Sequence, residues 1–404
     1  MKILMIAPEP FFEPRGTPFS EYFRIKALTE LGHKIDLATY HIGKDVEFAG
    51  LTIYRSLKIP FLRKVKVGPS WKKLFLDFFL FFTVLRLLFK NSYDCIHTHE
   101  EACFMGALLS RIWKIPHVYD MHSSLPQQFI NFNVTDSTWI YGLLQRFEKW
   151  ALRASDAIIA ICPDLVEHAE NAGVSNRVFV IENTAEASGE VSSESTEQRR
   201  QWKESKFGKK AVVLYTGTFE HYQGIDLLME SIPPVVRSMP EVLFLLIGGD
   251  QKSVARYRKK SEELSIVENV SIMEKVPPEE VVRYFEIADV LVSPRKSGTN
   301  TPLKIYSYLR SGKPIVATNL TSHTQVLNAE IAILTDPHPE AFALGILEAL
   351  QSPRVVSMVE RALQVAEEKY SYNQYVAKTS QLYAYILSLK KPPEYLNDNA
   401  SVLS

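Results

Sequence analysis

The sequence predicts an α/β protein built from two doubly wound domains, and three observations support this fold class. The chain has 404 residues, which is too long for one ordinary core and suits two domains of roughly 150 to 200 residues each. Short apolar runs alternate with longer helical patterns through most of the chain. A polar segment rich in Ser and Glu interrupts this alternation near the middle. Strands and helices that alternate in this way predict parallel sheets covered on both faces.

The first half of the chain contains apolar runs with the length of buried strands. They cover residues 2–8, 34–40, 93–99, 117–122, 156–162 and 178–183. We expect them to form the sheet of an N-terminal domain over residues 1–184. The next segment, residues 185–207, has few apolar residues and predicts a linker or mobile loop.

The alternation resumes after this segment with a second set of apolar runs. They cover residues 211–219, 241–249, 269–276, 288–294, 313–318 and 331–336. We expect a C-terminal domain over residues 208–369. Residues 370–390 carry an aromatic helix pattern that either caps this domain or packs back on the first, and residues 391–404 are expected to be a tail.

Charge and cysteine content exclude several classes of protein. The chain has 46 basic and 46 acidic residues, and this balance argues against a surface shaped for nucleic acid. The cysteines Cys95, Cys103 and Cys162 lack metal-binding spacing and are interpreted as buried thiols. Residues 1–8 are too short an apolar run for a signal peptide, so we expect a cytoplasmic protein.

One stretch raises a membrane hypothesis. Residues 55–73 contain seven Lys or Arg residues and no acid. The apolar residues 74–89 that follow are too few for a bilayer crossing and are interrupted by Asp77 and Arg86. Two interpretations stay open: a buried helix, or a basic and aromatic surface over residues 55–89 that rests on anionic lipid. The second interpretation makes the protein peripheral at the inner face of the plasma membrane.

In doubly wound sheets, ligands bind at the carboxyl ends of the strands, so the loops there supply the candidate site residues. After the first run, Gly16 permits close backbone approach, Thr17 can cap a helix, and Pro18 suits the first helical position. A helix N-terminus binds phosphate, although a plain turn gives the same pattern. His122 ends the run 117–122, and we interpret it as a functional residue beside a substrate.

His97, His99 and Glu100 lie at the carboxyl end of the run 93–99. The two histidines share one face of a strand, which is a spacing compatible with a metal ion. The sequence shows no third residue that would complete a metal site with these histidines, so no metal is predicted.

One loop of the second domain, after the run 211–219, is a further candidate for the site. Gly217 and Thr218 end one strand, and a helix starts near Gly224, but the loop matches neither a Walker A motif nor GxGxxG. The backbone N–H groups of this loop can donate to a phosphate.

The stretch at residues 297–312 predicts a helix from about Pro302 to Arg310. Thr299, Asn300 and Thr301 offer capping oxygens at its start. Lys304 lies in the first turn, where the helix dipole disfavours a cation, and this placement indicates a nearby anion. Arg295 in the preceding loop reinforces this interpretation.

The chain resembles glycosyltransferase family 4, whose members are retaining enzymes of the GT-B fold that use nucleotide-activated sugars. The resemblance covers nearly the whole chain. It rests on "MKILMIAPEP", "RGTPFSEYFRIKALTELGHKIDLATY", "YDCIHTHEEA", "YTGTFEHYQGIDLL", "ADVLVSPR" and "TPLKIYSYLRSGKPIVAT", which occur in the order of the family. It implies that the second domain binds the donor and the first binds the acceptor.

The resemblance also implies roles for individual residues. Gly16 lies near the donor diphosphate, His122 beside the transferred sugar, Gly217 at the start of a phosphate-facing loop, Val276 at the base, and Leu303 near the ribose and phosphates. The predicted donor-binding residues are Gly16, Thr17, Gly217, Thr218, Gln223, Val276, Thr299, Asn300, Thr301, Leu303 and Ser307. The predicted catalytic residues are His122, Lys304 and Arg295, and His99 and Glu100 are placed on the acceptor side.

Two pairs of departures from the family pattern bear on activity. The places where members commonly carry an arginine and a lysine hold Thr218 and Gln223, and the places of two glutamates hold Thr299 and Ser307. The local charge balance is unchanged, and Lys304 with Arg295 can stabilise the leaving group instead.

We therefore expect a retaining hexosyltransferase that uses a nucleotide sugar as co-substrate and needs no cofactor. The sequence contains no DxD motif for a divalent ion. The expected acceptor is a cell-envelope, lipid-linked or exopolysaccharide glycan. The alternative is a non-catalytic or partner-dependent homologue that binds nucleotide sugars.

Overall fold

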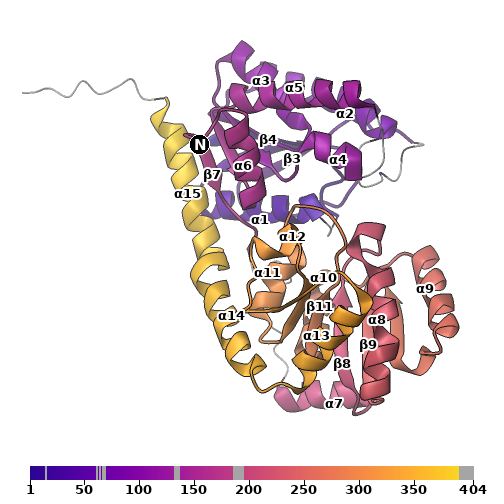
Figure 1. The fold of residues 1–404 in the computed structure, drawn as a ribbon. Helices are drawn as coiled ribbons and strands as arrows, with labels where there is room; N and C mark the ends of the chain where they lie inside the picture. The colour runs from indigo at the N-terminus through magenta and orange to yellow at the C-terminus, as the bar shows by residue number, and fades with distance from the viewer. Residues whose placement is uncertain are drawn as a thin grey trace, which may run out of the picture.

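The computed structural model describes residues 1–13, 16–60, 62, 65, 70–131, 137–184 and 195–390. These residues form two α/β domains, each with its own parallel sheet (Figure 1). The predicted fold class is confirmed.

The sheet of the first domain has seven parallel strands in the order β3-β2-β1-β4-β5-β6-β7. They are β1 Lys2–Ala7, β2 Lys34–Thr39, β3 Leu51–Arg55, β4 Cys95–His99, β5 His117–Met121, β6 Ala157–Ala160 and β7 Val178–Val180. Helices on its two faces are α1 Gly16–Glu30, α2 Trp71–Lys90, α3 Ala102–Trp113, α4 Leu125–Asn131, α5 Thr138–Ala154 and α6 Pro163–Asn171. The chain order reverses between β1 and β4, which is where such sheets bind ligands.

The sheet of the second domain has six parallel strands in the order β10-β9-β8-β11-β12-β13. They are β8 Ala211–Thr216, β9 Val242–Gly249, β10 Val270–Glu274, β11 Val290–Ser293, β12 Ile315–Thr318 and β13 Ile333–Thr335. The helices that follow are α8 Ile225–Ser238, α9 Gln251–Glu263, α10 Pro278–Ile287, α11 Leu303–Arg310, α12 Thr321–Thr324, α13 Pro339–Gln351 and α14 Val355–Tyr370. The order reverses between β8 and β11, so the two switch points are matched.

Every apolar run that predicted a strand contains one, and the sequence analysis missed a single described strand, β3. This strand pairs with β2 at the edge of the first sheet. Its residues are exposed or only half-buried. An edge strand needs no continuous apolar run, and this one therefore lacks the signal that marked the others.

The predicted linker or mobile loop over residues 185–207 is wrong for its second part. Residues Thr196–Phe207 form helix α7, which opens with a capping box in which Ser195 Oγ accepts from the Gln198 N–H at 3.2 Å. Trp202 packs against Tyr284 of α10, with ring centroids 5.3 Å apart. Residues 185–194 lie outside the described residues.

The chain crosses between the domains a second time near its end. Helix α14 packs on the second domain, where Ala362, Val365 and Tyr370 join the core. Helix α15, Tyr372–Ser388, packs on the first domain, where Leu382 and Tyr383 are buried against the sheet. Figure 1 shows this pair running along both domains. Of the two places considered for this segment, α15 takes the one on the first domain, while residues 391–404 lie outside the described residues.

Helix α2 settles part of the membrane hypothesis. Its inner side, with Leu76, Leu80 and Val84, is buried against the first sheet. Its outer side is exposed. The lipid interpretation of residues 55–89 stays a prediction, and residues 61, 63, 64 and 66–69 of that stretch lie outside the described residues. Among the described residues, no single helix is long and apolar enough to cross a membrane, and one sharply bent pair, Pro339–Gln351 with Val355–Ser388, passes on length and composition alone.

Candidate functional site: a cleft between the two domains

A cleft of about 570 Å³ lies between the domains and is lined by both. The loops that line it follow the carboxyl ends of strands in each sheet, as the switch-point rule requires. All predicted site residues except His99 and Thr299 line this cleft. They are Gly16, Thr17, Glu100, His122, Gly217, Thr218, Gln223, Val276, Arg295, Asn300, Thr301, Leu303, Lys304 and Ser307.

On the first domain, helix α1 begins at the cleft. Gly16 has a φ of +50°, and a Cβ placed there would meet no atom within 4 Å, so the backbone at the helix start is open to a ligand. The Thr17 hydroxyl donates a hydrogen bond to Glu100 Oε1 at 3.3 Å. Gly16, Thr17 and Pro18 line the cleft at this helix start, and a helix N-terminus is a place where an anion can bind.

His122 lies at the end of β5 and is almost fully buried. Its Nε2 is 3.3 Å from Asp120 Oδ1. Burial lowers the pKa of His122 below its usual value, so the ring is neutral near pH 7. Its backbone oxygen accepts a hydrogen bond of 2.6 Å from Asn300 Nδ2 of the second domain. The residue that ends β5 is thus also a point of contact between the domains.

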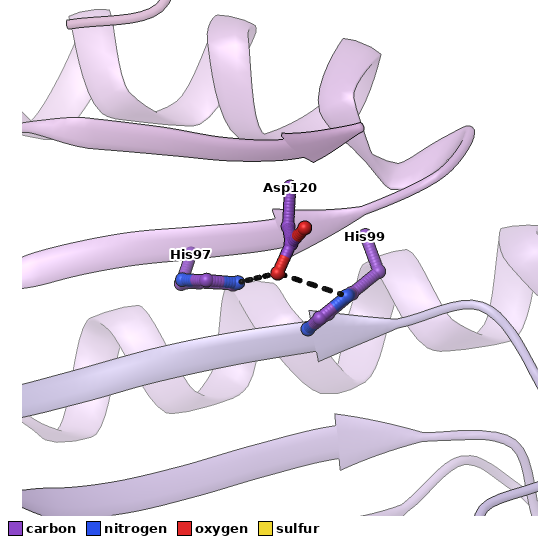
Figure 2. Close-up of side chains that lie close together, drawn as sticks. All are labelled: His97, His99 and Asp120. Atoms are coloured by element: carbon purple, nitrogen blue, oxygen red, sulfur yellow. Dashed lines mark ion pairs between the residues drawn. The ribbon is translucent and has the colours of Figure 1, made fainter. Parts of the chain in front are cut away.

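Next to His122 lies a buried cluster of polar side chains centred on Asp120. Figure 2 shows three of its members, His97, His99 and Asp120. Arg24 Nε donates to Asp120 Oδ2 at 3.0 Å, and His97 Nε2 and His99 Nδ1 approach the same oxygen at 3.4 and 3.8 Å. Burial alone would raise the pKa of Asp120, but Arg24 and the surrounding histidines hold it well below its usual range. Arg24 and Asp120 form a buried ion pair, and the rings of His97 and His99 lie close to it.

The sequence analysis was wrong that His97 and His99 lack a third group of metal-binding type, because Asp120 supplies one. The three ligand atoms lie within 4.8 Å of one another. Asp120 Oδ2, however, already accepts from the Arg24 guanidinium, and His97 Nδ1 lies 2.6 Å from the Tyr383 hydroxyl of α15. The Arg24 cation beside the shared oxygen opposes a metal ion at this place.

Of the two residues predicted on the acceptor side, one lines the cleft and the other does not. His99 is fully buried, does not line the cleft, and has its Nε2 3.7 Å from Glu21 Oε1, so its predicted contact with acceptor is not supported by its position. Glu100 lines the cleft and accepts hydrogen bonds from the Ser123 hydroxyl at 2.9 Å and the Gln128 amide at 3.0 Å. Burial and the neighbouring Glu101 raise the pKa of Glu100 to about 8.

On the second domain, the loop after β8 places Gly217, which has no side chain, at the cleft. Gly217 has a φ of +136°, and a Cβ there would lie 3.1 Å from the Tyr215 hydroxyl and 3.3 Å from Lys304 Nζ. A side chain at this position would crowd Lys304, and the positive φ also favours glycine. Thr218 and Gln223, where the family pattern has cations, line the same side.

Helix α11 begins at Leu303, close to the predicted start, but the predicted capping oxygens do not cap it. Its N-cap is Pro302, which makes no side-chain capping bond. The Asn300 amide reaches across to His122 instead, and Asn300 Oδ1 and Thr299 Oγ1 are buried without a hydrogen-bond partner among the described residues. Buried polar atoms without partners are costly, so the Asn300 oxygen at the cleft wall is placed to meet a ligand.

Lys304 and Arg295 bring two cations to the cleft, and neither has an ion-pair partner in the described part of the chain. Lys304 Nζ donates to the Thr216 carbonyl at 3.1 Å and lies 3.8 Å from the centre of the Tyr215 ring. Burial, and then Arg295, lowers the pKa of Lys304 well below its usual value. The Arg295 guanidinium carbon lies 5.1 Å from the centre of the Tyr222 ring. Burial lowers the pKa of Arg295. An anionic ligand between them offsets the cost of two buried cations.

Val276 and Ser307 both line the cleft. Val276 follows β10, and Ser307 lies on α11. Ser307 also lines a second cavity of about 450 Å³ between α7, α10 and α11. A small side chain here, where the family pattern has a glutamate, leaves the two cavities adjacent.

Several residues that shape the site were not found from the sequence. Asp120 sits inside an apolar run, and an acid in the middle of a buried strand was the signal that could have identified it. Lys73 and Glu101 form an ion pair at the cleft wall. Gln325 joins the domains, since its Oε1 accepts from the Asp164 N–H at 2.8 Å and its Nε2 donates to the Thr299 carbonyl. No local pattern predicts such a pairing across 161 positions of sequence.

Comparison with known sequences agrees with this geometry. The family profile "Glycosyl transferases group 1" matches residues 196–370, and "Glycosyltransferase Family 4" matches residues 24–187. The chain is 23% identical over 320 residues to the D-inositol 3-phosphate glycosyltransferase of Corynebacterium aurimucosum, covering 75% of this chain and 74% of that protein. It is 22% identical to the sulfoquinovosyl transferase SQD2 of Arabidopsis thaliana over 78% of this chain and 58% of that protein.

Solved structures share the fold at low sequence identity. The sucrose-phosphate synthase of Thermosynechococcus elongatus superposes with a TM-score of 0.78 at 17% identity, covering 96% of this chain and 99% of that one. Anabaena HepE in complex with UDP-glucose gives a TM-score of 0.71 at 16% identity, covering 96% and 100%. The two family profiles follow one another along the chain and together match most of it. These findings identify the protein as a glycosyltransferase of the GT-B fold that belongs to the family 4 type.

Proposed function

We propose that this protein transfers a sugar from a nucleotide-sugar donor to a cell-envelope, lipid-linked or exopolysaccharide acceptor, with retention of configuration and without a metal ion. The observation that carries the proposal is the pair of buried cations, Lys304 and Arg295, in a cleft formed by both domains. The related structure of Anabaena HepE holds UDP-glucose, which supports a nucleotide sugar as donor.

The donor diphosphate fits the second-domain side of this cleft. Lys304 and Arg295 face it as cations, and the backbone amides at the starts of α1 and α11 can donate to its oxygens. As the bond to the sugar breaks, negative charge develops on the leaving diphosphate, and these fixed donors stabilise it. Two side-chain cations and two helix starts can supply this stabilisation without a metal ion.

The acceptor fits the first-domain side. Glu100 is held by Thr17, Ser123 and Gln128 at the cleft wall, where its carboxyl group can hydrogen-bond an acceptor hydroxyl. Neutral His122 lies between the acceptor side and the donor side, next to the contact with Asn300. We further propose that the acceptor is met at the inner face of the plasma membrane, which makes this a peripheral protein.

Calorimetric titration with UDP-, GDP- and ADP-sugars, followed by a transfer assay with membrane extract as acceptor, tests the proposal. We expect one nucleotide class to bind and its sugar to appear on an acceptor product with unchanged anomeric configuration, in the presence of EDTA. An inverted product or a requirement for added metal would refute the corresponding part of the mechanism.

A second function has an observation of its own. Thr218, Gln223, Thr299 and Ser307 stand where the family pattern has two cations and two glutamates, and this loss favours a non-catalytic or partner-dependent protein that binds nucleotide sugars. Donor binding without hydrolysis or transfer, even with membrane extract present, would select this function over the enzyme.

A further inference from the structure

The outer side of α2 presents a stripe of aromatic side chains to solvent. Trp71, Phe78, Phe82 and Phe89 are 87%, 56%, 52% and 77% exposed. Their spacing of seven, four and seven residues keeps them on one side of a helix. The opposite side of α2 already packs on the sheet. The stripe is therefore an apolar surface that the fold of this domain does not use.

The apolar surface continues onto two neighbouring helices. Leu108 and Ile112 of α3 and Trp139 and Phe147 of α5 are also among the exposed large apolar residues. Ring contacts join the helices, from Phe89 to Trp113 at 5.3 Å and from Phe104 to Phe147 at 6.4 Å. Figure 1 shows α2, α3 and α5 beside one another on the first domain. We call their outer side the three-helix surface.

The charges on the three-helix surface have one sign. All exposed charged side chains of these helices are Lys or Arg, among them Lys72, Arg86, Lys90, Arg111, Arg146 and Lys149. The two acids of these helices are engaged elsewhere: Asp77 accepts from the Tyr40 hydroxyl at 2.5 Å, and Glu148 is buried. The whole chain has a formal net charge of zero, so this segregation is local.

The three-helix surface meets the catalytic cleft at one end. Lys73, in the first turn of α2, lines the cleft together with its ion-pair partner Glu101. Glu101 is adjacent to Glu100, the residue placed on the acceptor side. A molecule held at the three-helix surface therefore has a short route to the acceptor side of the site.

We propose that the three-helix surface docks this protein on a bilayer that contains anionic lipid, with the aromatic side chains in the interface and the basic side chains on the headgroups. The inference rests on the proposed function, because a lipid-linked acceptor is reached from such a position. Exposed aromatics surrounded by basic residues are the composition of an interfacial helix. A second copy of the chain fits poorly, since a symmetric contact would place like charges opposite each other.

Vesicle flotation of the full chain tests this docking. We expect binding to vesicles of phosphatidylcholine with phosphatidylglycerol at low salt, weaker binding at high salt, and little binding to phosphatidylcholine alone. The double variant Phe78→Ser, Phe82→Ser should reduce partitioning by about tenfold or more, because it removes two inserting rings. Leu344→Ser on α13, which is 68% exposed, is the matched control and should bind as the wild type.

The charge contribution has its own pair of variants. Arg86→Glu with Lys90→Glu should weaken binding to the anionic vesicles by about tenfold or more. Lys259→Glu on α9, whose side chain is 78% exposed, should leave binding unchanged. Absence of binding to anionic vesicles at low salt, or equal binding by the surface variants and the wild type, would overturn the proposal. A dimer in sedimentation without lipid that Phe78→Ser dissociates would assign the surface to a second copy instead.

Failure of docking and failure of the proposed function give different results. Vesicle binding needs neither donor nor turnover, and calorimetry with the nucleotide sugar needs no lipid. The aromatic variants should bind the donor as the wild type does, which also shows that they are folded. Docking without donor binding would refute the proposed function alone, and donor binding without docking would refute the three-helix surface alone.

Discussion

Lys304 is a buried cation whose charge is not balanced by an ion pair within the described part of the chain, and this makes it the most informative residue of the cleft. Charge-assisted hydrogen bonds to a phosphate contribute about 1.5–3 kcal/mol. We therefore expect Lys304→Ala to weaken donor binding roughly tenfold to a hundredfold, measured by calorimetry with the nucleotide sugar. Turnover should fall at least as far, because charge develops on the leaving group.

Lys304→Met separates charge from packing, because methionine keeps much of the apolar stem. We expect the methionine variant to lose donor affinity as the alanine variant does, while its thermal stability stays at or above that of the wild type, since an unpaired buried charge has been removed. Unchanged donor affinity and turnover in both variants would show that this lysine only packs at the start of α11.

Glu100 gives the cleft a pH dependence that can be measured without substrate. Burial, and then Glu101, raises its pKa from the usual 4.5 to about 8. The folded chain then binds more protons at this group than the unfolded chain, so its stabilising contribution is complete below pH 4.5 and is lost as the pH rises through about 8. We expect urea unfolding to show a smaller loss of stability across this range in Glu100→Gln than in the wild type.

A control for this pH dependence is Glu263→Gln, at a carboxylate whose side chain is 63% exposed. It should reproduce the wild-type dependence. Parallel curves for the wild type and Glu100→Gln would refute the raised pKa.

Asp120 holds together the buried cluster behind His122. Its replacement by asparagine leaves the Arg24 guanidinium buried without a counter-charge, which costs about 3–5 kcal/mol. Asp120→Asn should lower the free energy of unfolding by that amount in urea titrations. Asp94→Asn, at the half-exposed pair with Lys390, should cost at most about 1 kcal/mol. A rise in the melting temperature of the wild type on adding Zn²⁺ would contradict the interpretation as an ion-pair network.

At the scale of elements, α15 is a part of the first domain that the chain supplies last. Leu382 is fully buried in the core of that domain, whereas Leu387 on the same helix is 43% exposed. Leu382→Ala should destabilise the protein by about 2–5 kcal/mol, because it leaves a cavity. Leu387→Ala should cost much less, and chemical denaturation measures both. Equal effects would mean that α15 does not complete this core.

The strands could be predicted from the sequence because most of them are buried on both faces. Such strands read as continuous apolar runs, and each predicted run contains a strand. Edge strand β3 is only half-buried and lacked this signal. Helix α7 was missed because none of its side chains is fully buried. Its capping box, with Ser195 and Gln198, was the local signal that could have found it.

The site could be predicted only where it depends on strand ends. Residues that follow strands, such as Gly16, His122 and Gly217, do line the cleft. The orientation of side chains within a strand depends on neighbours far away in sequence, and this is why His99 turned out to be buried. The same limit hid the pairing of Arg24 with Asp120, since it joins a helix to a strand 96 positions later.

At the scale of the whole molecule, the cleft exists because two separate sheets are held with their switch points facing. The crossing of α14 and α15 forms one connection between the domains. The contacts of Asn300 with His122 and of Gln325 with Asp164 join the rims of the cleft. In the first connection, α14 and α15 are each packed into the apolar core of one domain. The second connection consists of single hydrogen bonds. The rims can therefore separate and close while the connection through α15 persists.

Gln325 provides the test of this closure, because its side chain bonds a group on each domain and lies outside the cleft lining. One hydrogen bond contributes about 1 kcal/mol, so its loss shifts a balance of closed and open forms by about fivefold. Gln325→Ala should increase the radius of gyration of the ligand-free protein in small-angle scattering, and saturating donor should restore the closed value. Gln364→Ala, which removes an exposed side-chain contact on α14, should scatter as the wild type does. If Gln325→Ala also scatters as the wild type, the rim contacts do not set the opening of the cleft, and the connection through α15 alone fixes the arrangement of the domains.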